Sequence, residues 1–153
     1  MRSINIDINS IKFCNSQMLQ RLAKIDLIQD YVQEKISMIE TYLAEQPAEY
    51  DPPLDGPNLT NAEVFRTYIV RYLRTRSDIH QEIMSLLVRA LSPSDHGLPI
   101  EVYAFTKTTE WARYENIQAE IFDHLIAATP FFDLRLFQQP TGLDFSKLSP
   151  SLE

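Results

Sequence analysis

The side chains best able to do chemistry in this sequence are three histidines and one cysteine, because imidazole and thiolate groups bind metals and act as bases or nucleophiles. His80, His96 and His124 lie far apart in the chain, and none has HExxH or another metal-ligand spacing. Glu120 and His124, four residues apart, could share a ligand, but a solvated ion pair on a helix flank is the simpler interpretation. The histidine spacing therefore predicts no metal site.

Cys14 has no histidine near it in the sequence, so we expect it to pack as a small apolar group. As a single cysteine it can form no internal disulfide and no multi-cysteine zinc site, which fits a reducing compartment. The glycines Gly56, Gly97 and Gly142 stand apart, so no glycine-rich phosphate-binding motif is present. We expect no catalytic residues, no cofactor and no enzymatic activity.

Tyr103 and Phe105 are two residues apart on a predicted strand, which is the spacing by which RNA-recognition modules stack bases. The basic, glycine-containing sequence of those modules is absent, and the formal charge of −7 opposes phosphate binding. We expect no nucleic-acid partner. Aromatic and arginine side chains are enriched where proteins meet proteins, so these rings favour a protein partner.

Hydrophobic periodicity predicts the elements that position these side chains. Ile4, Ile6 and Ile8 alternate with polar residues, as in a strand with one buried face, and residues 16–46 have the pattern of one long amphipathic helix. The proline-rich segment 47–57 predicts an exposed loop. The later elements expected are a helix at 61–77 capped by Asn61, strands at 83–90 and 98–106 joined as a hairpin, a helix at 109–128 capped by Thr108 or Thr109, and a strand at 132–138.

Without the long helix, this order is that of a ferredoxin-like split β-α-β-β-α-β fold, so we expect the α+β class with a four-stranded antiparallel sheet. Right-handed crossovers place both helices on one face of that sheet. We expect a single domain at 1–143 and a flexible tail at 144–153. The residues expected to face the helices are Ile4, Ile6, Ile8, Met84, Leu86, Val88, Ile100, Val102, Ala104, Phe132, Leu134 and Leu136.

Alternation assigns Asn5, Asp7 and Glu101 to the opposite face of the sheet, together with a candidate protein interface. That candidate interface consists of Leu87, Arg89, Tyr103, Phe105, Arg135 and Phe137. Two interpretations of this face stay open. Either the long N-terminal helix covers it as ordinary core, or a protein partner covers it.

No window approaches the roughly 18 consecutive apolar residues of a membrane helix, and the N-terminal residues lack the apolar centre of a signal peptide. We therefore expect the chain as given to be soluble. Met1 leads almost directly into a strand pattern, so the chain can also be a fragment of a longer protein.

Four segments together carry a resemblance: RSINIDINSIKF, FRTYIVRYLRTRSDIHQ, GLPIEVYAFTKTTEWARYENIQAEIFDHL and LFQQPTG. They resemble the cytoplasmic C-terminal domain of mechanosensitive ion channels of the small-conductance (MscS) family, and most closely its miniconductance branch. The segment 47–57 and the tail after Gly142 fall outside the resemblance.

In that family, transmembrane helices and a β-domain precede an α/β domain of this kind, and seven identical subunits enclose a hollow cytoplasmic cage. The resemblance implies a cage domain of a channel in the bacterial inner membrane that releases small solutes and ions on osmotic downshock. The chain would then meet the membrane only through a missing transmembrane region. The alternative is a free-standing ferredoxin-like regulator that binds a small ligand or a protein partner.

Overall fold

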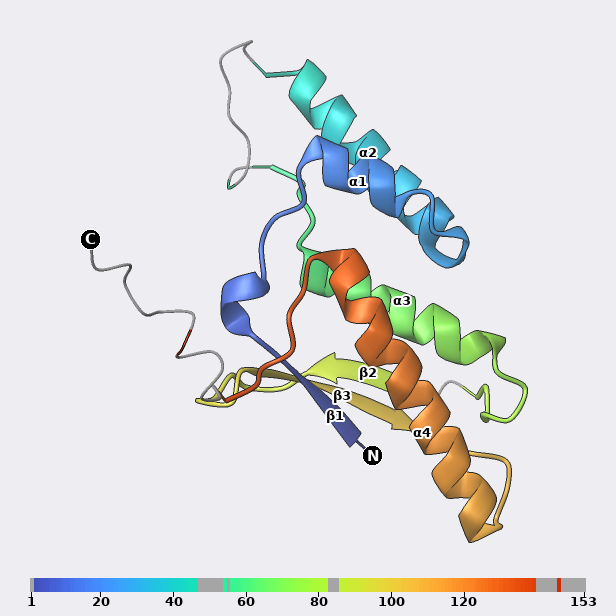
Figure 1. Ribbon diagram of the computed structural model, residues 1–153. Coiled ribbons are helices and arrows are strands. Elements are labelled where there is room, and N and C mark those ends of the chain that lie inside the picture. The colour runs from blue at the N-terminus through green and yellow to red at the C-terminus, as the bar shows by residue number, and fades with distance from the viewer. Residues whose placement is uncertain (1, 47–53, 55, 83–85, 140–145, 147–153) are drawn as a thin grey trace.

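The computed structural model describes residues 2–46, 54, 56–82, 86–139 and 146. The chain belongs to the α+β class, with three layers: a sheet, a pair of helices above it, and a helical hairpin above that pair (Figure 1). Most of the predicted flexible tail at 144–153, most of the loop at 47–57 and Met84 lie outside the described residues. The elements in chain order are β1 (Arg2–Ile6), η1 (Ile8–Ser10), α1 (Ser16–Leu22), η2 (Asp26–Ile28), α2 (Gln29–Ala44), α3 (Asn61–Thr75), β2 (Leu86–Ala90), β3 (Leu98–Ala104), α4 (Trp111–Ala128) and η4 (Thr129–Phe132).

The sheet is antiparallel and has the order β1-β3-β2, so the central strand is β3. Strands β2 and β3 form the expected hairpin, which closes at a bridge between Ser94 and Gly97. The expected fourth strand at 132–138 is only partly formed. Its first residue, Phe132, ends the 3-10 helix η4, and the residues after it make one bridge, Ile6 to Leu136, beside β1.

Helices α3 and α4 both cover one face of the sheet (Figure 1). The alternating residues Ile4, Ile6, Ile100 and Val102 point to those helices and are buried, as the period-2 pattern predicts. Ile8 was expected on the same face but is 45% exposed. The reason is local, since the chain leaves the sheet after β1 and turns into the 3-10 helix η1, which breaks the alternation.

The prediction of one continuous helix over residues 16–46 is wrong, because the helix is interrupted in its middle. The chain turns at 23–28, through the short helix η2, and α1 and α2 lie side by side as an antiparallel hairpin (Figure 1). Neither proline nor glycine marks the break. Turning back places Leu22, Ile28 and Val32, each with no exposed surface, in the common core, so tertiary packing overrides the local helical periodicity.

The two caps predicted at helix starts are also wrong. Thr60, not Asn61, caps α3 by accepting a hydrogen bond from the Glu63 amide. Glu110 occupies the N-cap position of α4, and Thr108 instead accepts a hydrogen bond from the Glu110 amide. In the part of the chain that the structure describes, no helix is both long enough and apolar enough to cross a bilayer.

Candidate functional site

The three histidines lie in separate environments. His80 donates its backbone amide to the carbonyl of Phe105, and His96 lies on the hairpin turn, beside Asp95 and Phe137. His124 lies on α4, facing α3. Within residues 2–46, 54, 56–82, 86–139 and 146, no three His, Cys, Asp or Glu side chains gather as a metal site.

His124 and Glu120 do not form the ion pair that their spacing suggested. Nε2 of His124 lies 2.7 Å from the hydroxyl of Tyr68, and the imidazole stacks on the ring of Tyr72 with centroids 3.9 Å apart. Burial, and secondarily the charge of Arg76, lower the pKa of His124. The folded protein therefore favours a neutral imidazole at this position.

Arg76, which follows α3, takes Glu120 as its own partner. Its guanidinium donates to both carboxylate oxygens of Asp78, at 2.9 and 2.7 Å, and to Glu120 at 2.8 Å. Such a forked arrangement is geometrically specific. The hydrogen bonds from Arg76 hold the pKa of Asp78 below its usual range. Arg76, Asp78 and Glu120 thus connect the end of α3 to α4. Because their charges and hydrogen bonds are directed at one another, we assign them a structural role.

Cys14 is half-buried between β1 and α1. Burial raises the pKa of Cys14 to about 11, so the thiol stays protonated at neutral pH. The nearby charges of Lys12 and Arg21 oppose that shift, but each lies 3.0 Å from a carboxylate oxygen of Asp133. A protonated thiol is a poor nucleophile.

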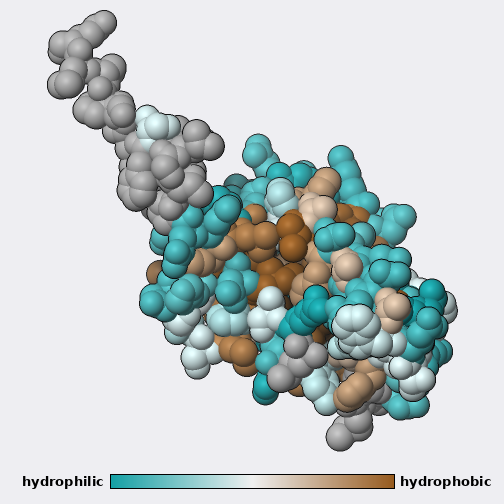
Figure 2. All heavy atoms as spheres, turned by 60° about the horizontal axis from the view of Figure 1, so that its bottom comes forward, coloured by the Kyte–Doolittle hydropathy of each residue, from teal (hydrophilic) through white to brown (hydrophobic). Residues whose placement is uncertain are grey.

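The second face of the sheet, opposite α3 and α4, is the candidate interface surface. The hairpin α1–α2 lies on the far side of α3 from the sheet, so the interpretation in which the N-terminal helix covers this face is wrong (Figure 1). Figure 2 brings the underside of Figure 1 forward and shows apolar residues gathered there inside a polar surround. Leu87 and Phe105 are each 48% exposed.

The six candidate interface residues fall into two groups. Leu87 pairs with Tyr103 across β2 and β3, and the rings of Tyr103 and Phe105 meet edge to face with centroids 5.0 Å apart. Arg89, one step along, lies 2.9 Å from Glu101, a carboxylate that is only 7% exposed. We call this the first group; it consists of Leu87, Arg89, Tyr103 and Phe105. Its apolar and aromatic side chains form a contiguous surface beside the ion pair of Arg89 and Glu101.

Phe137 and Arg135 form the second group, beyond β1. The amide of Phe137 donates to the carbonyl of Asn5, whose cross-strand partner is Pro99, four residues from Tyr103 on β3. Four residues along a strand and two strand spacings separate Phe137 from Tyr103 by roughly 16 Å. Arg135 pairs with Asp7 at 3.0 Å. The sequence placed all six residues on one face, but the structure separates them into two groups.

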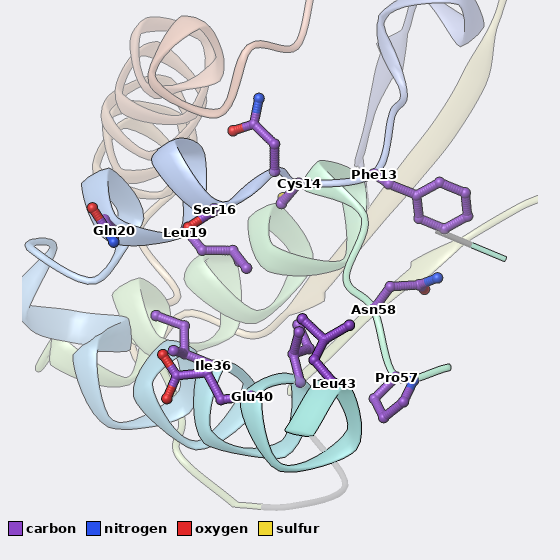
Figure 3. Close-up of a pocket in the computed structure, with 12 residues that line it drawn as sticks. Phe13, Cys14, Ser16, Leu19, Gln20, Ile36, Glu40, Leu43, Pro57 and Asn58 are labelled. Atoms are coloured by element: carbon purple, nitrogen blue, oxygen red, sulfur yellow. The ribbon is translucent and has the colours of Figure 1, made fainter. Parts of the chain in front are cut away.

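A groove beside the hairpin α1–α2 was missed by sequence reasoning. It has a volume of about 410 Å³, and Figure 3 shows side chains from α1, from α2 and from the segments around Phe13 and Pro57 around it. The groove lies between α1 and α2. Sequence reasoning treated these two helices as one continuous helix at 16–46, and a single helix has no second helix beside it to form a groove. The sequence signal for the groove was limited to the apolar Phe13, three residues before the predicted helix, and Leu43 near its end.

Comparison with known families finds a match over most of the chain. The family described as "Mechanosensitive ion channel MscS, C-terminal" matches residues 2–129. The matched range contains β1, both helical layers and the β2–β3 hairpin. No solved structure matches the chain.

Proposed function

Because this chain belongs to the family of C-terminal domains of MscS mechanosensitive ion channels, we propose that it forms part of the wall of a cytoplasmic cage below the pore of such a channel. The channel would be a homo-oligomer, a heptamer of the miniconductance branch, in a bacterial inner membrane. Its role would be to release small solutes and ions on osmotic downshock. The observation that carries the proposal is the family match over residues 2–129.

The first-group surface supports an assembly role. Leu87, Tyr103 and Phe105 present apolar area on a sheet face that no element described in the structure covers (Figure 1). At about 25 cal/mol per Å² of apolar area, covering several such side chains is worth a few kcal/mol. We place a neighbouring subunit, or another part of the same channel, over this face.

Replacing Tyr103 and Phe105 together with alanine tests the interface. In the full-length channel the double variant should weaken assembly, measured as loss of the oligomer on light scattering after detergent extraction. The 153-residue chain should lose little thermal stability, because these rings do not lie in the core. A matched control is Phe131→Ala, since Phe131 is 69% exposed and lies in η4, outside the sheet.

A thermal loss in the 153-residue chain of the size typical for core truncation, about 3–5 kcal/mol, would contradict the interface and make these rings core residues. So would unchanged assembly of the double variant in the full-length channel. A phenotype of Phe131→Ala equal to that of the double variant would show general loss of solubility instead of a specific interface.

The channel function itself is tested by the coding sequence and by survival. Several apolar segments of membrane length are expected upstream in the reading frame, and cells that lack other such channels should survive osmotic downshock when the full-length protein is restored. A reading frame that starts at Met1, with no rescue, would contradict the channel proposal.

The alternative, a free-standing regulatory domain that binds a small ligand or a protein partner, has one observation in its favour. The groove beside α1–α2 has a volume within the range of about 300–1,000 Å³ that is typical of small-molecule sites. The same reading of the upstream sequence separates the two candidates, because a regulator needs no membrane segments.

A further inference from the structure

We propose that the groove beside α1–α2 binds an amphipathic organic cation, meaning a small molecule with an apolar body and an ammonium or amidinium head. This inference does not depend on the channel proposal, because it rests on the shape, lining and charge of the groove alone. The groove has a volume of about 410 Å³, which accommodates an organic molecule of modest size.

The apolar part of the site lies between the two helices. Leu19 of α1 and Ile36, Ile39 and Leu43 of α2 line it, and Figure 3 shows Leu19 facing Ile36 and Leu43 across the space. Leu19 is 5% exposed and belongs to the common core, so this wall is anchored. Leu43, by contrast, is 38% exposed. A ligand with an apolar body would cover it, and this burial is the main source of affinity.

The charge of the head follows from the α2 side of the groove. Glu40 is the one charged residue that lines it among the residues described, and it is exposed. Glu40 lies one turn from the C-terminus of α2, where unpaired carbonyl groups carry partial negative charge and no basic residue lies in the last turn. Both contributions favour a cation and disfavour an anion.

The opposite end of the groove is electrically balanced. Lys12 and Arg21, the cations near Cys14, both pair with Asp133 at 3.0 Å. Asp133 carries one negative charge against those two cations, and Glu63, the remaining charge near Cys14, supplies the second, so the four charges sum to zero. The uncompensated charge therefore lies at Glu40. A cationic head at that position, with its hydrocarbon against Leu19 and Ile36, fits both features at once.

The test uses three compounds that share a phenylbutyl body and differ only in the head: 4-phenylbutylamine, 4-phenylbutanol and 4-phenylbutyrate. Each is titrated into the 153-residue chain, labelled with ¹⁵N, and binding is located by amide chemical shifts. The amine should perturb amides at 13–20 and 36–43, and it should bind about tenfold more tightly than the carboxylate, with the alcohol between them.

Two pairs of variants assign the contacts. Glu40→Gln should weaken binding of the amine about two- to fivefold, the range expected of an exposed ion pair, while Glu34→Gln, on the same helix but outside the groove, should not. Ile39→Trp should fill the groove and abolish binding, while Met38→Trp, 46% exposed and outside the groove, should leave it intact. Leu43→Trp replaces Ile39→Trp if the latter fails to fold.

Several results would overturn the proposal. These are amide perturbations located elsewhere, equal or tighter binding of 4-phenylbutyrate, or unchanged affinity in both tryptophan variants of the groove. Amine affinity that falls as the protein concentration rises would also overturn it, because a second copy of the chain would then be the occupant.

Discussion

The side-chain nitrogen of Asn61 donates a hydrogen bond of 3.0 Å to the carbonyl oxygen of Phe132, a residue 71 positions further along the chain. The same nitrogen donates to the carbonyl of Ser10 at 2.9 Å, and the side-chain oxygen accepts from the amide of Lys12 at 2.9 Å. Asn61 has no exposed surface. One side chain thus satisfies three backbone groups where the segment after β1, the start of α3 and the end of η4 meet.

Asn61→Ala should therefore be among the most damaging single polar substitutions in this chain. It leaves three backbone groups without their partner inside the protein, and we expect a loss of about 2–4 kcal/mol in the free energy of unfolding. Urea denaturation measures it. Asn116→Ala, at an exposed position of α4, is the matched control and should change stability little. A loss below about 1 kcal/mol would show that water replaces these bonds.

Gly97→Ala should destabilise the β2–β3 hairpin. Gly97 has φ of 89°, a conformation that residues with a Cβ adopt at a cost, and an added Cβ would collide with the carbonyl oxygen of Ile6. We expect a loss of about 1–3 kcal/mol by thermal melting, because both the turn and the edge of β1 must shift. Ser92→Ala, exposed in the same connection, serves as the control. Equal melting of the two variants would contradict this account.

His124 should make the protein less stable in mild acid. Its pKa is lowered in the folded state, first by burial and then by Arg76, so the unfolded chain binds the proton more readily. Stability from this group is therefore present above the unfolded pKa of about 6.5 and is lost as the pH falls through the lower, folded value. His124→Gln should reduce the drop in melting temperature between pH 7 and pH 5. An identical drop in both proteins would contradict this assignment.

Two carboxylates should cause a second loss of folding stability in acid, at a lower pH than that of His124. The pKa of Asp78 is lowered mainly by its hydrogen bonds to Arg76, and that of Asp133 mainly by Lys12. Stability from both groups is present above the unfolded value of about 3.9 and is lost as the pH falls below it. The melting temperature of His124→Gln should therefore still decline below about pH 4.

Arg76→Lys should weaken the contact between α3 and α4 although it keeps the charge. Lysine cannot reach both oxygens of Asp78 and Glu120 with a planar fork, and the Arg76 side chain is only 17% exposed. We expect a loss of about 1–2 kcal/mol by urea denaturation. Arg74→Lys, at an exposed position two residues earlier, controls for the substitution and should be nearly neutral. A variant as stable as wild type would show that charge alone accounts for the role of Arg76.

Local pattern was sufficient to predict the α+β class and most of the elements. Ile4 and Ile6 alternate with polar residues because successive side chains of a strand point to opposite faces, and that property needs no knowledge of the partner strand. The same holds for α3, whose buried apolar residues Phe65, Ile69 and Leu73 recur every four residues along one side of the helix. The assignment of Leu87, Tyr103 and Phe105 to the face opposite the helices followed from the same alternation.

Candidate chemistry was less predictable, because its geometry depends on partners far away in the chain. Glu120 and His124 are neighbours on α4, yet Glu120 pairs with Arg76, at the C-terminal cap of α3, and His124 pairs with Tyr68 of α3. Asn61 has the residue type of a helix cap, but the approach of Ser10 and Phe132 turns it into a buried hydrogen-bonding centre.

The sequence by itself determined which residues need burial and where strands and helices form, because those properties follow from spacing along the chain. Only the tertiary structure decided that the helical pattern at 16–46 breaks at 23–28. An unbroken helix there satisfies local periodicity, but it cannot bring both Leu22 and Val32 into the core beside α3. The same turn creates the groove and leaves the outer face of the sheet uncovered by α1 and α2, because one hairpin cannot pack on both sides of the molecule.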